Sequence, residues 1–184
     1  MIAGEGCVRK EPGEGAQTTD RSVIVAVISD THMPRGKRRF PDACVERLKG
    51  ADVILHAGDF MELEVLEALQ ALGPPVHAVR GNVDSSQLLT RLPLMRTIDL
   101  EGVRIGMVHD AGPAQGRLAR MRNRFPDAHA VIFGHSHIPL HEARENFQIF
   151  NPGSPTERRR SPQHTMGVAT VKGDAVSFEL IALD

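Results

Sequence analysis

The 184-residue chain contains no tryptophan and no tyrosine, and its aromatic residues are seven phenylalanines. Proteins that stack single-stranded nucleic acid on aromatic rings need more such side chains, so we do not expect that kind of binder. Net charge is also nearly absent, because 22 basic residues are balanced by 23 acidic ones and the formal charge is −1. This balance favours neither nucleic acid nor an anionic membrane as a partner.

Cysteine and long apolar runs are scarce as well. The two cysteines, Cys7 and Cys44, provide neither a disulfide framework nor a cysteine-rich zinc site. No segment approaches the run of about 18 apolar residues that a transmembrane helix requires. Charged residues and glycines interrupt the N-terminus where a signal peptide would have its apolar core. We therefore predict a cytoplasmic protein without a membrane attachment.

The chain divides into a short extension and one domain. Residues 1–21 are rich in Gly, Glu and Thr and show little apolar periodicity, which predicts a disordered N-terminal extension. The folded domain is expected over residues 22–184. It begins with the β-branched run Val23–Ile28, which is typical of a central strand that is buried on both faces of a layered α/β fold.

Further elements follow from short apolar runs and from apolar spacing. Strands are predicted at 53–56, 76–79, 97–100, 103–108, 130–133, 148–150, 165–171 and 175–181, and helices at 62–72 and 114–124. Glu101-Gly102 is a good two-residue hairpin turn. This order of elements predicts an α/β fold in which a two-sheet β-sandwich is flanked by helices.

Polar side chains follow five of the predicted strands directly. They are Asp30 and His32 after 23–28, Asp59 after 53–56, Asn82 after 76–79, His109 after 103–108, and His135 and His137 after 130–133. Ligand and catalytic sites of α/β sheets lie at the carboxyl ends of strands. Carboxylate, carboxamide and imidazole donors suit borderline divalent ions such as Mn²⁺, Fe²⁺, Ni²⁺ or Zn²⁺.

Each of these residues alone has an ordinary explanation as a core histidine or a turn residue. Burying all of them without a cation would be costly, however, and this favours a metal site. In Asp30-x-His32 and His135-x-His137, an extended backbone would send both side chains of a pair to one side, where each pair could hold one ion. Gly58, Gly81 and Gly134 would let the backbone turn tightly before the ligands.

The ordered set Asp-x-His, Gly-Asp, Gly-Asn, His and Gly-His-x-His resembles the calcineurin-like metallophosphoesterase superfamily, from about residue 23 to 180. The segments Gly81–Asp84 and Asn151–Ser154 resemble its small bacterial and archaeal phosphodiesterase branch. The resemblance implies a four-layer α/β/β/α metallophosphoesterase domain, with residues 151–154 near the metal loops.

The resemblance also implies two divalent metal ions. One would be held by Asp30, His32, Asp59 and His137, and the other by Asp59, Asn82, His109 and His135, with Asp59 bridging. A hydroxide bridging the metals would hydrolyse a small phosphorylated substrate, with Asp59, Asn82 and His109 as the catalytic residues. Mn²⁺ is the expected activating ion, and Fe²⁺, Ni²⁺ and Zn²⁺ are the other candidates.

Two positions in the Gly-Asn block need separate comment. Many members of the superfamily have a histidine after Gly-Asn that acts as general acid, but this chain has Val83 there. Valine cannot donate a proton, so the proton for the leaving group must come from another residue or be unnecessary, as with acidic leaving groups such as nitrophenolate. Asp84 either orients Asn82 or a neighbouring histidine, or caps the following turn.

Two functions other than a metal-dependent phosphodiesterase are compatible with the same motifs. The first is a non-enzymatic protein-binding scaffold of the same fold, as in a retromer subunit, and the intact set of His109, His135 and His137 argues against it. The second is a nuclease, which would need a further DNA-binding domain. The basic runs 35–39 and 158–160 either contact an anionic substrate or lie in solvated loops. The sequence leaves a homo-oligomer open.

Overall fold

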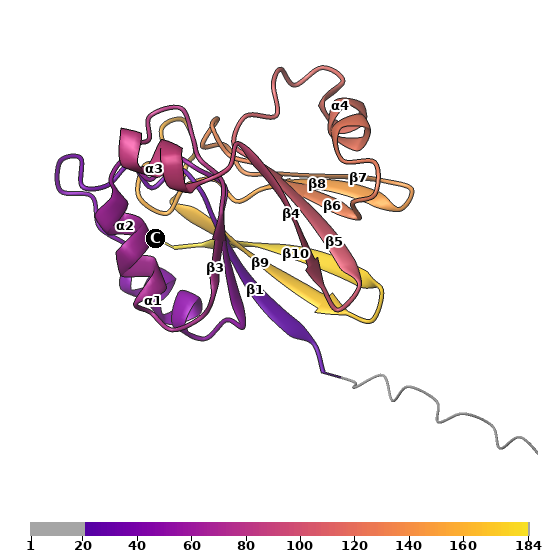
Figure 1. Ribbon diagram of the computed structural model, residues 1–184, viewed down its shortest axis with the longest axis horizontal. Coiled ribbons are helices and arrows are strands. Elements are labelled where there is room, and N and C mark those ends of the chain that lie inside the picture. The colour runs from indigo at the N-terminus through magenta and orange to yellow at the C-terminus, as the bar shows by residue number, and fades with distance from the viewer. Residues whose placement is uncertain (1–20, 184) are drawn as a thin grey trace, which may run out of the picture.

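The computed structural model describes residues 21–183, in which two β-sheets are stacked between two layers of helices (Figure 1). This arrangement confirms the predicted helix-flanked sandwich. The predicted disordered extension lies, except for Arg21, outside the described residues. Within residues 21–183, no helix is both long enough and apolar enough to cross a membrane.

The first sheet has the strand order β10-β9-β1-β2-β3. Its strands are β1 (Val23–Ile28), β2 (Val53–His56), β3 (Val76–Ala78), β9 (Thr165–Lys172) and β10 (Ala175–Ala182). β1, β2 and β3 are parallel, and the register aligns Ile28 with His56 and His56 with Ala78. Their carboxyl ends therefore lie at one edge of the sheet, which is where the loops with Asp30, Asp59 and Asn82 begin.

The second sheet has the order β4-β5-β6-β8-β7. Its strands are β4 (Met95–Leu100), β5 (Val103–Val108), β6 (Ala130–Ile132), β7 (Leu140–Arg144) and β8 (Phe147–Asn151). β5, β6 and β8 are parallel to one another. Glu101 and Gly102 have φ angles of 53° and 88°, as the central residues of a type I′ hairpin turn require, so the predicted hairpin is confirmed.

Four helices cover the outer faces of the sheets (Figure 1). They are α1 (Asp42–Lys49), α2 (Leu63–Gln70), α3 (Ser86–Arg91) and α4 (Arg117–Arg124). The predicted helices 62–72 and 114–124 correspond to α2 and α4. α4 begins three residues later than predicted because Gly116, with a φ of 69°, adopts a left-handed conformation at its N-cap.

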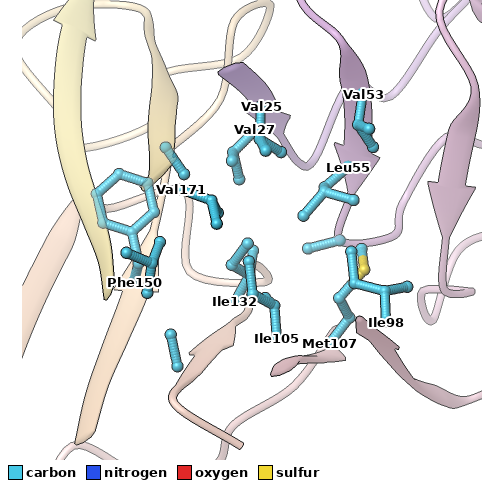
Figure 2. Packing of buried hydrophobic residues seen from close by; sticks show 14 of the residues in the cluster. Val25, Val27, Val53, Leu55, Ile98, Ile105, Met107, Ile132, Phe150 and Val171 are labelled. Carbon is cyan, nitrogen blue, oxygen red and sulfur yellow. The ribbon is translucent and has the colours of Figure 1, made fainter. Parts of the chain in front are cut away.

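The core follows from the alternation of side chains along the strands. Val25 and Val27 of β1 point into the space between the sheets, where they face residues such as Ile132 (Figure 2). Ala26 and Ile28 point the other way, into a cluster with residues of α1 and α2. The prediction of a strand buried on both faces is thereby confirmed. Full burial of a valine or isoleucine contributes roughly 1.5–3 kcal/mol.

Candidate metal centre

All seven predicted site residues lie together where the carboxyl ends of β1, β2, β3, β5 and β6 meet. Six of them form two groups whose ligand atoms lie within 4.8 Å of one another in each group. The first group is Asp30, His32 and His137, and the second is Asp59, His109 and His135. The seventh residue, Asn82, lies against the second group.

The first group is buried and closely spaced. Nε2 of His137 lies 3.1 Å from Nε2 of His32 and 3.4 Å from Oδ1 of Asp30. The distance from Nε2 of His32 to Oδ1 of Asp30 is 4.0 Å. With metal–ligand bonds of about 2.1 Å, two ligand atoms of one ion lie roughly 3–4 Å apart. The donor atoms and their spacing therefore fit one divalent ion.

The second group opens toward solvent. Oδ1 of Asn82 lies 3.1 Å from Nε2 of His109 and 2.9 Å from Nδ1 of His135. Nε2 of His109 is in turn 3.2 Å from Oδ2 of Asp59. His109 and Asp59 are buried, whereas Asn82 and His135 are exposed. This group fits a second ion that a substrate could reach.

Outer hydrogen bonds orient two of the imidazoles. Nδ1 of His109 donates to the carbonyl oxygen of Ala57 at 2.7 Å, and Nδ1 of His137 donates to that of Glu157 at 2.6 Å. A carbonyl oxygen only accepts, so in each neutral ring the proton sits on Nδ1. The Nε2 atoms that face the two groups are then free to bind a metal.

The backbone at the ligands differs from the prediction. Asp30, His32, His135 and His137 have φ angles of 57°, 44°, 69° and 59°, and Asp59 has 62°. The prediction of extended backbone in Asp30-x-His32 and His135-x-His137 is therefore wrong. His135 and His137 also diverge, one to each group, instead of holding one site together. Strained backbone of this kind costs of order 1–3 kcal/mol per residue and clusters at functional sites.

The glycines before the ligands serve two purposes. Gly58 has a φ of 93° and makes the tight turn that was predicted. Gly134 instead allows a close approach, because a Cβ there would collide with Oγ of Ser29 and Oδ2 of Asp30. A Cβ at Gly81 would likewise collide with Asp59. Glycine is therefore required at positions 81 and 134 because a side chain would collide with a ligand residue, and a tight turn is not the reason.

Burial is the largest influence on the pKa values of four side chains in the site. Burial raises the pKa of Asp30 to about 7. Burial is the largest single influence on Asp59 and acts to raise its pKa. The hydrogen bond and charge of His109, the backbone N–H of Val83 and the charge of His32 together outweigh burial and lower that pKa to about 2. Burial lowers the pKa of His137 to about 4 and also lowers that of His32. The protein alone thus keeps His32 and His137 neutral, the form that binds metals.

Residues outside the two groups hold the ligand loops in place. Nδ2 of Asn151 donates to the carbonyl oxygen of Gly134 at 2.9 Å, and Oγ of Ser154 donates to that of Asp30 at 2.8 Å. Residues 151–154 therefore lie beside the site, as the resemblance implied. The two carboxylate oxygens of Asp84 accept from the backbone nitrogens of Met61 and Gly81, at 2.9 and 2.7 Å. Both donors precede Asp84 in the chain, and α3, which follows it, has no side-chain cap, so the predicted cap of the following turn is not what the structure shows. Asp84 instead links the loop after Asp59 to Gly81, the residue before Asn82.

One carboxylate beside the first group has no counterpart in the sequence prediction. Oε2 of Glu157 lies 3.8 Å from Nε2 of His32, and its Oε1 accepts a 2.6 Å bond from Arg38. Glu157 lies in an irregular loop and belongs to none of the motif blocks, so no local pattern marks it. His56 stacks on Phe60 and joins neither group.

Known proteins resemble this chain along most of its length. Residues 23–174 match the calcineurin-like phosphoesterase superfamily domain. A probable metallophosphoesterase of Methanothermobacter thermautotrophicus is 32% identical over 161 residues, which cover 86% of this chain and 92% of that protein. The phosphodiesterase YfcE of Escherichia coli is 31% identical over 96 residues, half of each chain.

The fold has solved counterparts as well. The crystal structure of Vps29 from Chaetomium thermophilum superposes with a TM-score of 0.73 at 20% identity, covering 86% of this chain and 97% of that one. At this level of identity the similarity concerns the fold. The family match and the archaeal relative decide membership: this chain belongs to the calcineurin-like phosphoesterase superfamily.

Proposed function

We propose that this chain is a divalent-metal-dependent phosphodiesterase with a two-metal site. The observation that carries the proposal is the position of Asp59, whose Oδ2 lies 3.4 Å from Nε2 of His32 and 3.2 Å from Nε2 of His109. A single carboxylate oxygen thus faces both ligand groups. The name of the E. coli relative supports a diester as substrate.

The ligands would be divided as the two groups suggest. Asp30, His32, Asp59 and His137 would hold one ion, and Asp59, Asn82, His109 and His135 the other. Two such ions act as Lewis acids on a bound phosphate and make water a nucleophile at neutral pH. Mn²⁺ is the ion that we propose, although Fe²⁺, Ni²⁺ and Zn²⁺ suit the same donors.

The chain's own residues set the substrate class. Oδ1 of Asn82 faces the two histidines, which leaves Nδ2 as the donor for a phosphate oxygen. Val83 follows Asn82 with 40% of its surface exposed and offers no proton for a leaving group. Small phosphodiesters with acidic leaving groups, which need no such proton, are therefore the substrates that we propose.

A non-enzymatic protein-binding scaffold of the same fold is the alternative function. The scaffold hypothesis does not require buried imidazoles aimed at a common point. His32 and His137 are nevertheless 3% and 0% exposed, with their Nε2 atoms 3.1 Å apart. Imidazole nitrogens gathered beside the carboxylates of Asp30 and Asp59 suit a shared divalent ion, which favours the enzyme.

Hydrolysis of bis-p-nitrophenyl phosphate by metal-stripped protein tests the proposal, with and without added Mn²⁺ and alongside His109→Ala. We expect turnover that depends on Mn²⁺ and is lost in the variant. No turnover with any of Mn²⁺, Fe²⁺, Ni²⁺ or Zn²⁺ would move the assignment to the scaffold. Turnover that survives in His109→Ala would place the reaction at another site.

A further inference from the structure

Glu157 is a charged residue beside the first ligand group for which the proposed function gives no role. Its Oε2 lies 3.8 Å from Nε2 of His32 and 3.9 Å from Nδ1 of His137. Its side chain is only 23% exposed. Nδ1 of His137 is the nitrogen that donates to the carbonyl oxygen of Glu157 itself, so the approach to Nε2 of His32 is the contact on the metal-binding side.

The backbone of Glu157 is fixed with respect to the ligand loops. Its nitrogen donates to Oγ of Ser154 at 2.9 Å, and its carbonyl oxygen accepts the 2.6 Å bond from Nδ1 of His137. The neighbouring Thr156 donates through Oγ1 to the carbonyl oxygen of Thr31 at 2.6 Å. The side chain therefore starts from a position that is tied both to the loop of Asp30 and His32 and to that of His137.

We propose that Oε2 of Glu157 is an additional ligand of the ion held by the first group. The inference rests on the proposed two-metal function. Ligand atoms of one ion with bonds of about 2.1 Å lie roughly 3–4 Å apart. Its 3.8 Å distance to Nε2 of His32 falls in that range, as does the 3.4 Å distance between Nε2 of His32 and Oδ2 of Asp59.

Arg38 orients the carboxylate of Glu157 by binding one of its two oxygens. Its Nη2 donates to Oε1 of Glu157 at 2.6 Å, and its Nη1 donates to the carbonyl oxygen of His32 at 3.5 Å. Oε1 is thereby occupied, and Oε2 is the oxygen that faces His32. The guanidinium also offsets the added negative charge. The competing explanation is an ion pair that only links two loops and has no part in metal binding.

Isothermal titration of metal-stripped protein with Mn²⁺ separates the two explanations. If Glu157 is a ligand, Glu157→Gln should weaken the binding of one of the two ions by at least about tenfold. Replacing a group that only supports a ligand already costs about tenfold or more, and replacing a ligand should cost no less. Arg38→Gln, which removes the same ion pair but keeps the carboxylate, has the smaller effect. The matched control is Glu67→Gln, which neutralises an exposed glutamate paired with Arg91 at 3.7 Å and should bind both ions like the wild type.

Each outcome decides something. Equal effects of Glu157→Gln and Arg38→Gln, or no effect of Glu157→Gln on a wild type that binds two ions, would overturn the Glu157 inference and leave the two-metal proposal standing. Failure of the wild type to bind two ions would overturn both. A Zn²⁺-loaded crystal structure gives a direct readout, because a ligand oxygen should lie about 2.0–2.2 Å from the ion. A water molecule between Oε2 and the ion would contradict direct ligation.

Discussion

Oδ2 of Asp59 lies 3.2 Å from Nε2 of His109, although α2, β3, α3, β4 and β5 separate the two residues in the chain. The other oxygen, Oδ1, accepts a hydrogen bond from the backbone nitrogen of Val83 at 3.1 Å. That bond fixes the rotation of the carboxylate. Oδ2 is therefore held toward the space between the two ligand groups, where His32 approaches it from the other side.

Because of this position, Asp59→Asn should affect both proposed ions. The amide removes the negative charge that the two groups share, so we expect the purified variant to retain neither ion. Turnover of bis-p-nitrophenyl phosphate should fall by at least about a hundredfold, beyond the loss typical of groups that only support ligands. Elemental analysis after desalting measures the first effect. Asp99→Asn, near the end of β4, is the control. Two retained ions in Asp59→Asn would rule out the bridging role.

Single-histidine variants should separate the two groups. His32 belongs to the first group and His109 to the second. We therefore expect His32→Ala and His109→Ala each to lose mainly one of the two ions that such a site holds. Titration with Mn²⁺ counts the ions that remain. Loss of both ions in each variant would mean that the groups act as one cooperative unit.

Gly134→Ala should disturb the site by steric collision alone. A Cβ at this position would meet Oγ of Ser29 and Oδ2 of Asp30, so a ligand carboxylate would have to move. We expect a loss of roughly 1–3 kcal/mol in the free energy of unfolding, as for other overpacked positions, together with weaker metal binding. Urea unfolding and Mn²⁺ titration measure the two effects. Gly50→Ala is the control, since Gly50 has a φ of −83° and its nearest Cβ contact is an ordinary 3.4 Å.

The metal-free protein should lose stability as Asp30 ionises. The pKa of Asp30 is raised from 3.8 to about 7 in the folded protein. Between these values the folded state holds a proton that the unfolded state has released, so the free energy of unfolding falls as the pH rises through this window. Relative to Asp30→Asn, the wild type should lose on the order of a few kcal/mol between about pH 4 and pH 8.

Urea unfolding in the presence of a chelator tests this, and the comparison with Asp30→Asn cancels the titration of groups remote from Asp30. His77 is one such group: burial lowers its pKa, so stability rises with pH below the ordinary histidine value in both proteins. A constant difference between wild type and variant across the pH range would show that Asp30 is ionised throughout.

The strands were predicted well where apolar side chains mark them, and β7, whose side chains are mostly polar, was not predicted. Val23–Ile28 is a run of apolar residues because both of its faces are covered, and such a run is visible in the sequence. Leu140–Arg144 forms β7, but its residues after Leu140 are exposed and include His, Glu and Arg. An edge strand of this composition has no apolar alternation to detect. Hydrogen bonding to β8, which is a tertiary contact, makes it a strand.

The site, like the strands, has features that are visible in the sequence and others that depend on tertiary contacts. The residue types that end five strands are local features, and they predicted the set of seven residues that the structure brings together. The left-handed backbone of five of them was not predictable, because an isolated Asp or His prefers other conformations and only the surrounding loops hold φ in the left-handed region. Glu157 could not be predicted either, since its place depends on bonds to Ser154 and His137. The cytoplasmic location and the disordered extension at residues 1–21 stay predictions.

By itself, the sequence determined the layered α/β architecture, the edge of the sheets where the polar residues gather, and the chemistry of their donor atoms. These properties depend on side-chain type and on short-range periodicity, which the chain carries whether or not it is folded. Only the tertiary structure decided that His135 and His137 serve different groups, that one oxygen of Asp59 faces both groups, and that Glu157 stands beside His32. These are distances between residues on separate strands and loops, and they come to exist only when the two sheets pack against each other.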